Sequence, residues 1–444
     1  MWLPVTLPLL MTRMLCAEFT RRKLTSTFEQ RFLEEIVPRF IYDVQAALAK
    51  DLTGLSDAQL WVRCETWQRR TLVDFARESL KPTALALLAL GRLDQRLTQF
   101  LGSERAGQAA RELIMNVPPR KEADLVEALR EVAAGRLPQD SFLNCFGHRG
   151  RNEMELAEPR WSERITPREV PPVDSQIGTA GFATTNGAEA IEKIWARIAE
   201  EAKFAPAVAE RIRHEVLALR SWVSLRETAK HYFMHGYAVI RRLLCELDRR
   251  FQLDGGIFFL TAAEVPELLR GEKLHRVVET RRRRHRLTSQ LQVPAVLFSD
   301  NLDSIGQESP VEGASVLQGI PLSPGQAQGP AAVLDEPTNE PLPEPYVLVC
   351  PSTDPAWIPL FARATALVME TGGVLSHGAI VAREFGLPAV AGIPGIQHKI
   401  KMGQLIRVDG KSGVVTLIDR PQTMDPEIKS GIQAGGSDCK TRKG

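Results

Sequence analysis

The stretch Thr371–Val390, TGGVLSHGAIVAREFGLPAV, decides the fold of the second half of this chain. It places His377 shortly after a glycine pair and at the start of an apolar, alanine-rich run. The run 376–385 predicts a helix, with Ser376 as its N-cap because a serine side chain there accepts a backbone N–H hydrogen bond. A glycine and then a proline follow the run, in the order that ends a helix.

The first turn of this predicted helix suits an anion, because its N–H groups lack helical partners and the dipole is positive there. Gly372 and Gly373 let the backbone turn sharply and approach a ligand without a Cβ in the way. Thr371 and Ser376 carry hydroxyls that can donate hydrogen bonds to phosphoryl oxygens. His377 is therefore a candidate phosphoryl carrier. From the motif alone, a buried histidine at a glycine turn is the favoured interpretation, and the surrounding sequence changes that balance.

The sequence on both sides alternates between strand-like and helix-like patterns. Residues 346–373 predict strand, helix, strand and loop, and 404–419 predict two strands about an Asp409–Gly410 turn. The whole block resembles the phosphohistidine swivelling domain of the phosphoenolpyruvate-utilising enzymes, which include pyruvate phosphate dikinase, phosphoenolpyruvate synthase and rifampicin phosphotransferase. The matching residues are Ser323-Pro324-Gly325, Thr353-Asp354-Pro355, Thr371-Gly372-Gly373, Ser376-His377, Ala382-Arg383-Glu384 and Val408-Asp409-Gly410.

The resemblance implies that His377 attacks a phosphoryl group of a nucleotide and hands it on to a second substrate, while the domain swings between two sites. Thr371, Gly372, Gly373 and Ser376 would then stabilise the phosphoryl group. An Arg–Glu pair inside a helix is a solvated or structural feature, so 383–384 receive no catalytic role. Where the dikinases have Thr before the Ser–His pair and Ala after it, this chain has Leu and Gly. That variant is similar to the rifampicin phosphotransferase branch.

The first half of the chain is predominantly helical by pattern. Residues 25–135 and 188–251 carry apolar side chains at three- and four-residue spacing. Residues 151–186, rich in proline, predict a long loop or a mobile lid. The segment 255–271 predicts a short strand, Ile257–Leu260, followed by a helix that Thr261 caps.

These patterns predict an α+β multidomain protein, in which a mainly α-helical N-terminal domain precedes an α/β swivelling phosphohistidine domain. The boundaries that we expect are 1–300 for the helical, acceptor-binding domain, 301–316 for a hinge linker, 317–420 for the swivelling domain and 421–444 for a disordered tail.

A second group of chemically active residues lies in 145–163, CFGHRGRNEMELAEPRWSE. Charged side chains are rarely buried unless paired, so Arg149 and Glu153 belong either to a structural ion-pair network or to a site. Arg226 and Lys230 are four residues apart on one helical face and can cradle phosphoryl oxygens. Both segments resemble the middle domain of rifampicin phosphotransferase-like enzymes, where the acceptor binds. The resemblance thus makes all four residues candidates for binding an acceptor or a phosphate.

His231 and His235 also lie four residues apart, a spacing that can bind a metal on a helix. No third ligand, such as the glutamate of an HExxH motif, accompanies them. We therefore predict no metal site, and expect an aromatic cavity wall formed with Tyr232, Phe233 and Tyr237.

Composition excludes several classes of partner. The net charge of +2 over 444 residues favours neither nucleic acid nor a membrane surface, and no apolar run is long enough for a transmembrane helix. The apolar start lacks a basic region and holds two prolines, which argues against a signal peptide. The six cysteines lack metal-ligand spacing and indicate reduced thiols in the cytoplasm.

No ATP-binding part is visible, since no glycine-rich phosphate loop stands between a strand and a helix. The resemblance implies Mg²⁺ and ATP through a missing or separate ATP-grasp domain, with the β-phosphate passing by way of the histidine to a small-molecule hydroxyl. A fragment, a subunit of a split enzyme and a repurposed module all remain open. Two alternative functions also remain: a phosphoenolpyruvate synthase-like component with pyruvate as acceptor, and a non-catalytic remnant that binds a small molecule. The sequence names neither the acceptor nor the oligomeric state.

Overall fold

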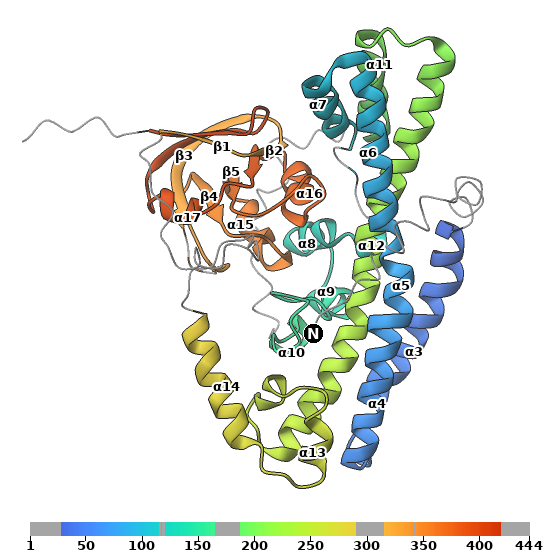
Figure 1. The fold of residues 1–444 in the computed structure, drawn as a ribbon, viewed down its shortest axis with the longest axis vertical. Helices are drawn as coiled ribbons and strands as arrows, with labels where there is room; N and C mark the ends of the chain where they lie inside the picture. Colours follow the sequence, from blue (N-terminus) through green and yellow to red (C-terminus); the bar gives the residue numbers. More distant parts are fainter. Residues whose placement is uncertain are drawn as a thin grey trace, which may run out of the picture.

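The structure, a computed structural model, describes residues 28–114, 117, 120–164, 187–289, 315–338, 340 and 342–418. Figure 1 shows an elongated helical part and, beside it, a compact part built around a sheet. The predicted fold class, helical N-terminal region and C-terminal α/β region, is confirmed. The predicted linker and tail, and 165–186 of the predicted lid, lie almost wholly outside the described residues, so the domain boundaries stay predictions.

The helical part contains short π- and 3₁₀-helices, labelled η, as well as α-helices. In chain order they are η1 (Phe32–Ile36), α3 (Val37–Ala49), α4 (Asp57–Arg69), η2 (Arg70–Phe75), α5 (Ala76–Ser79), α6 (Lys81–Leu101), α7 (Ser103–Leu113), η3 (Lys121–Ala123), α8 (Leu125–Ala133), α9 (Gln139–Phe146), α10 (Trp161–Arg164), α11 (Gly187–Glu201), α12 (Pro206–Phe251), η5 (Gly256–Phe259), α13 (Val265–Leu269) and α14 (His275–Thr288).

The central element is α12, whose 46 residues span about 69 Å at 1.5 Å per residue. Apolar residues such as Ile212, Val216 and Leu219 recur along it at helical spacing and pack against α3, α4 and α6. Gly236 allows close contact with η2, because a Cβ there would lie 2.3 Å from the Thr71 hydroxyl oxygen. This long, well-buried helix forms a rigid support for the side chains that face the sheet part.

The sheet has eight strands in the order β1-β8-β7-β3-β4-β5-β6-β2. Their bounds are β1 (Val316–Gln318), β2 (Ile320–Ser323), β3 (Gln326–Val333), β4 (Tyr346–Cys350), β5 (Ala364–Met369), β6 (Ala389–Ala391), β7 (Leu405–Asp409) and β8 (Val414–Leu417); the helices between them are η7 (Pro355–Trp357), α15 (Ile358–Phe361), α16 (His377–Glu384) and α17 (Ile396–Lys399). Strands β3 to β6 pair in parallel and the outer pairs are antiparallel. The predicted hairpin about Asp409–Gly410 is β7–β8.

Both faces of the parallel strands are buried, as an apolar run such as Tyr346–Cys350 requires. Alternate residues point to opposite faces, so Leu348 and Val349 belong to different apolar clusters. The Leu348 cluster also contains residues of α8, α9, α15 and α16. Helices α8 and α9, although distant in sequence, therefore share the core of the sheet part.

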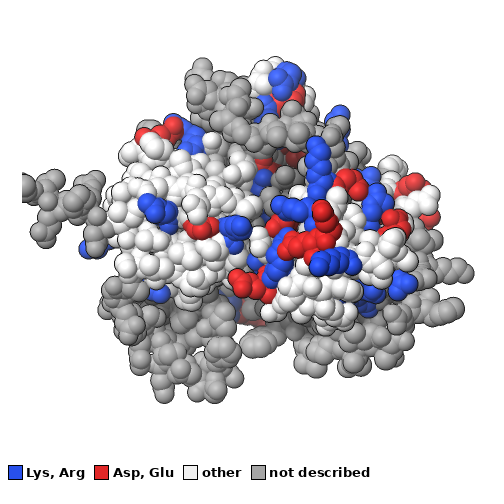
Figure 2. Space-filling view, turned by 90° about the horizontal axis from the view of Figure 1, so that it is seen from above, with Lys and Arg blue, Asp and Glu red and all other residues white. Residues whose placement is uncertain are grey.

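Charged residues of both signs lie together on the helical end of the molecule that carries α7 and α11 (Figure 2). Arg105 of α7 pairs with Glu201 of α11 at 2.6 Å, and Arg213 of α12 pairs with Glu192 of α11 at 2.9 Å. These exposed pairs tie neighbouring helices together. None of the described helices is both long enough and apolar enough to span a bilayer.

One local prediction is wrong. Residues 257–260 do not form a strand; Gly256–Phe259 is a 3₁₀-helix. The Asp248 carboxylate accepts the N–H groups of Gly255 and Ile257, which winds the chain into a turn directly after α12. Thr261 is not the cap of the next helix either, since it donates both its N–H and its hydroxyl to the Glu264 carboxylate.

Candidate functional site

His377 is the first residue of α16, and Ser376 is the N-cap, as predicted. The Ser376 hydroxyl accepts the N–H of Ala379 at 3.3 Å. The following glycine is required by packing: a Cβ at Gly378 would lie 2.5 Å from the Thr353 hydroxyl oxygen and 2.6 Å from the sulfur of Met369. Glycine at position 378, where the dikinases have Ala, therefore lets α16 approach the ends of β4 and β5 closely.

The other residues predicted to stabilise a phosphoryl group lie nearby but are differently engaged. The Thr371 hydroxyl donates to the Pro351 carbonyl at 3.0 Å. Neither Gly372 nor Gly373 has a positive φ. A Cβ at Gly372 would lie 3.1 Å from the Cβ of Ala391, whereas no described atom lies within 4 Å of one at Gly373. Gly372 thus allows close packing against Ala391, whereas Gly373 has open space around it. Neither glycine adopts a left-handed conformation.

The helical part brings the four other candidate residues to one place. Arg226 and Lys230 project from α12, while Arg149 and Glu153 lie in the loop that follows α9. That loop doubles back on itself, since the Trp161 N–H donates to the Arg149 carbonyl at 2.9 Å.

Glu153 is the centre of this group and is 3% exposed. Its carboxylate accepts a bidentate pair of hydrogen bonds from Arg149, the longer of 3.2 Å, and a 2.6 Å ion pair from Lys230. Burial by itself would raise the pKa of Glu153, but Arg149 and Lys230 outweigh it and lower that pKa to about 2. A buried carboxylate thus holds two cations side by side. From the sequence alone, Arg149 and Glu153 could have belonged either to a structural ion-pair network or to a functional site.

Arg226 joins the helical part to the loop before His377. Its guanidinium donates to the Leu375 carbonyl, and it lies 3.3 Å from a carboxylate oxygen of Glu227. Burial would raise the pKa of Glu227, but Arg226, Lys230 and His377 lower it. The Glu227 Oε1 atom is buried without a hydrogen-bond partner among the described residues.

Two further contacts hold the same faces together. Arg151 pairs with Glu336 of the sheet part, and the Asn152 N–H donates to the Asp354 carboxylate at 2.7 Å. All these contacts come from the 149–153 loop or α12, so the candidate residues of the two parts meet across one interface.

His377 is half-buried at this interface, and its Nε2 atom is buried without a hydrogen-bond partner among the described residues. Burial, with smaller contributions from Lys230 and Arg149, lowers its pKa to about 4, although Glu227 and Glu153 act in the opposite direction. The imidazole is therefore neutral at pH 7, which leaves a lone pair on one ring nitrogen. A neutral histidine at a helix N-terminus, facing two cations, is an arrangement that can form a bond to a phosphoryl group and neutralise its oxygens.

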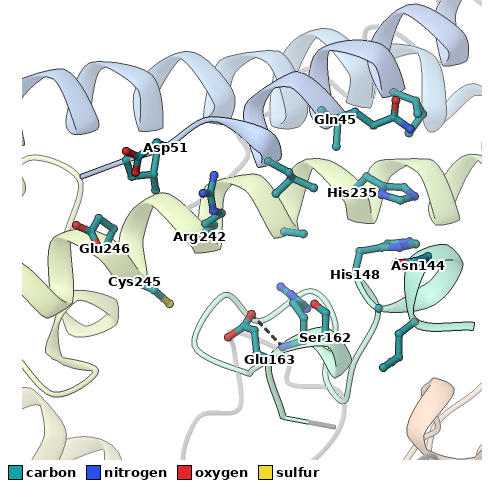
Figure 3. Close-up of a pocket in the computed structure, with 18 of the residues that line it drawn as sticks. Gln45, Asp51, Asn144, His148, Ser162, Glu163, His235, Arg242, Cys245 and Glu246 are labelled. Carbon is teal, nitrogen blue, oxygen red and sulfur yellow. Dashed lines mark hydrogen bonds between the residues drawn. The ribbon is translucent and has the colours of Figure 1, made fainter. Parts of the chain in front are cut away.

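A cavity of about 700 Å³ lies between α3, α12 and the segment that contains His148 and Glu163 (Figure 3). Its wall includes apolar side chains of α3, and His148, His235 and Arg242; His377 is not part of it. Tyr232, Phe233 and Tyr237, predicted to form an aromatic cavity wall, do not line this cavity; they pack against the helical core.

The sequence missed two residues that the structure places in or beside the site. Glu227 was considered there merely as a partner for Arg226. The expectation that His231 and His235 have no third companion is also wrong, because His148 brings one ring nitrogen within 4.8 Å of one from each of them. No spacing rule indicates a contact across 83 residues, and only the proximity of the 145–163 and 225–244 segments in the fold creates it.

Comparisons with known proteins agree with the resemblance that the motifs indicated. Residues 342–413 match the family described as PEP-utilising enzyme, mobile domain. Rifampicin phosphotransferase of Bacillus cereus is 30% identical over 296 residues, which cover 63% of this chain and 34% of that protein. The enzyme of the same name from Streptomyces sviceus is 30% identical over 317 residues, covering 66% and 36%. Phosphoenolpyruvate synthase of Aeropyrum pernix is 42% identical over 111 residues, covering 24% and 14%.

The resemblance to both kinds of enzyme is thus confirmed, and the stretch that matches the mobile-domain family lies within residues 317–420. The chain spans about a third of the length of the rifampicin phosphotransferases that it matches.

Proposed function

We propose that this chain is the carrier and acceptor part of a phosphotransferase, in which His377 accepts a phosphoryl group and passes it to a small-molecule hydroxyl. The observation that carries the proposal is the meeting of His377 with Arg149, Glu153 and Lys230 at one interface. The relatives named above support the general chemistry. The phosphoryl donor, ATP with Mg²⁺, would come with an ATP-grasp part that lies outside these 444 residues, in the same protein or in a separate subunit.

The transfer has two steps. In the first, the lone pair on the unpartnered His377 Nε2 attacks phosphorus, an N–P bond forms and the P–O bond to the donor breaks with its electrons leaving on the donor oxygen. In the second, the acceptor hydroxyl oxygen attacks phosphorus and the N–P bond breaks, which returns the electron pair to the imidazole. The ionised Glu227 carboxylate, whose Oε1 atom lies 3.3 Å from Arg226 and makes no hydrogen bond among the described residues, would accept the hydroxyl proton.

Charge stabilisation falls to the cations. Lys230 lies near enough to His377 to lower its pKa, so its ammonium group would face the phosphoryl oxygens. Arg149 shares the Glu153 carboxylate with Lys230, and this fixes both in place before the substrate arrives. Arg226 acts by positioning, because it holds the backbone at Leu375, two residues before the carrier.

The cavity between α3 and α12 is the place where we expect the acceptor. Apolar residues Ile41, Val44 and Leu48 form one side, and polar groups including His235 and Arg242 lie opposite. A volume of about 700 Å³ suits a drug-sized molecule with an apolar body and a few polar groups. The loop that lines it leads directly into Arg149, one residue beyond His148.

A donor-independent experiment tests the carrier. The full chain is incubated with potassium phosphoramidate, which transfers a phosphoryl group to imidazole with loss of ammonia, and the modified residue is located by mass spectrometry. We expect an acid-labile phosphoryl group on His377, and none there in His377→Ala, whose circular dichroism and thermal midpoint stay close to those of the parent. The exposed His398 serves as an internal reference. Labelling of His398 with no labelling of His377, in the parent chain and also in Arg226→Ala, which loses the link across the interface to the Leu375 carbonyl, would remove the carrier role.

A second experiment tests the donor. The chain is mixed with Mg-ATP, labelled on its β-phosphate, with and without an ATP-grasp protein encoded beside it. Transfer of label to His377 that requires this second protein would support the split-enzyme form. Label that His377→Ala retains would contradict the proposed mechanism.

A further inference from the structure

A cluster of three histidine rings lies beside, and separate from, the groups that face His377. His148 comes from the turn after α9, and His231 and His235 come from one face of α12. One ring nitrogen of each lies within 4.8 Å of one from each of the others. The His148 and His235 rings are stacked with their centroids 3.5 Å apart, and the His231 ring stands edge-on to both (Figure 3 labels His148 and His235).

Two of these rings carry a buried nitrogen that nothing described satisfies. His148 and His231 are 6% and 3% exposed, and the Nδ1 atom of each lacks a hydrogen-bond partner among the described residues. Buried polar atoms without partners are rare in folded proteins, and each calls for an explanation such as an ion. The other nitrogen of His148, Nε2, lies 3.1 Å from the backbone carbonyl of His231.

A hydrogen bond from one ring nitrogen to a backbone carbonyl is typical of a histidine that binds a metal through its other ring nitrogen. An N–H at Nε2 donating to a carbonyl fixes the ring and its tautomer, which leaves the lone pair on Nδ1 for a metal. Burial lowers the pKa of His231 to about 2 and that of His235 to about 4, and it lowers the pKa of His148 as well. All three rings are thus neutral at pH 7, which is the form that coordinates metals.

We propose that His148, His231 and His235 form a binding site for one divalent transition-metal ion of the zinc class. Three imidazole ligands favour Zn²⁺, Co²⁺, Ni²⁺ or Cu²⁺ over Mg²⁺ and Ca²⁺, which prefer oxygen. His148 and His235 line the 700 Å³ cavity, so the ion would have a fourth position open to water or to a ligand in it. The ion would also tie the 147–150 turn to α12, one residue from Arg149.

Two features of the surroundings shape how the ion would bind. Arg149 lies close enough to lower the pKa of all three rings, and its positive charge opposes a second cation. Glu153, which pairs with both Arg149 and Lys230, offsets part of that charge. Nitrogens on a tetrahedral zinc with bonds of about 2.0–2.1 Å are about 3.4 Å apart. The rings therefore close in on the ion, and the stack of His148 on His235 opens.

The test is metal binding to the full chain, purified without a polyhistidine tag and stripped with a chelator. Zn²⁺ is titrated by calorimetry, and Co²⁺ by its visible absorption. We expect one equivalent per chain, and a weakening of more than about 100-fold in His235→Ala, since losing even a supporting residue costs roughly 10- to 100-fold. His235 is half-buried and is the member of the cluster whose replacement disturbs the fold least.

Three controls make the result specific. His214→Ala, an exposed histidine of the same helix, retains full binding. Cys245→Ser retains it too, although that thiol lines the same cavity. His235→Gln, which keeps the side-chain size, loses binding as His235→Ala does. The proposal is overturned if the parent chain takes up no stoichiometric Zn²⁺ or Co²⁺, or if His235→Ala binds as tightly as His214→Ala. Neither outcome bears on the phosphorylation of His377, so the two proposals fail separately.

Discussion

Replacing Glu153 by glutamine tests whether the buried charge network holds the site together. The substitution keeps the shape of the side chain and removes its charge. Arg149 and Lys230 then remain side by side with no carboxylate between them. Breaking a buried ion pair by removing one partner costs about 3–5 kcal/mol, because the remaining charge is left uncompensated.

The pKa of Glu153 gives a second, independent magnitude. A carboxyl whose pKa falls from 4.5 in the unfolded chain to about 2 in the folded one is stabilised by about 3 kcal/mol in its ionised form. The folded-state pKa is depressed, so this stability is present above the unfolded value and is lost as the pH falls toward 2. About 3 kcal/mol at pH 7 becomes about 1 kcal/mol at pH 3.

Urea unfolding of the parent chain and of Glu153→Gln at a series of pH values measures this directly. We expect the two free energies of unfolding to differ by about 3 kcal/mol at pH 7 and to converge as the pH drops from 5 to 3. Glu155→Gln is the matched control: Glu155 is exposed, two residues away, and an amide oxygen can still accept the Ala157 N–H. A difference that does not vary with pH would refute the reasoning that charge, rather than shape, is what Glu153 contributes.

Three further substitutions distinguish residues that position the site from residues that matter for packing. Arg226→Ala removes the donor to the Leu375 carbonyl, a charged hydrogen bond worth about 1.5–3 kcal/mol, and the ion-pair partner of Glu227. We expect phosphoryl transfer to an acceptor to slow about 10- to 150-fold, and the thermal midpoint to fall as well; an unchanged rate would remove Arg226 from the site. Gly378→Ala forces a Cβ into the Thr353 hydroxyl, so we expect it to lower the free energy of unfolding by about 1–3 kcal/mol. Gly373 has open space around it, so Gly373→Ala changes that free energy by less than about 0.5 kcal/mol. Urea unfolding measures both. Equal effects of the two glycine substitutions would contradict the packing account.

The sequence predicted the sheet part well because its signals are local. The cap at Ser376, the helix that follows and the hairpin at Asp409–Gly410 each depend on neighbours within about four residues. The strand predicted at 257–260 is wrong because the interaction that decides the conformation of this segment is not local. Its apolar residues suit a strand or a buried turn equally, and the carboxylate of Asp248, nine residues before Ile257, decides between them.

The site could be predicted as a set of residue types but not as an assembly. Pairing at four-residue spacing placed Arg226 and Lys230 on one face of α12, and a resemblance singled out Arg149 and Glu153. That Glu153 holds Lys230 depends on a loop 77 residues earlier in the chain folding back against α12. The third histidine, His148, entered the cluster by the same route, and helical periodicity carries no information on such contacts.

The contacts across the interface also indicate which parts would move if His377 travels to a donor. Its Nε2 is buried in this arrangement, so a phosphoryl donor can reach it only after the interface opens. The polar links that must break are Arg226 to the Leu375 carbonyl, Arg151 to Glu336 and the Asn152 N–H to Asp354. The apolar side chains of Val374 and Leu375 must also leave the core of the helical part, against which they pack.

Helices α8 and α9, in contrast, share an apolar cluster with the sheet, which costs far more to separate. If the sheet part swings, these two helices are therefore expected to move with it, and the opening falls between them and α12. The 147–150 turn lies at this boundary and carries both His148 and Arg149. A metal ion that ties His148 to α12 would hold the turn, and with it Arg149, on the acceptor side while the carrier leaves.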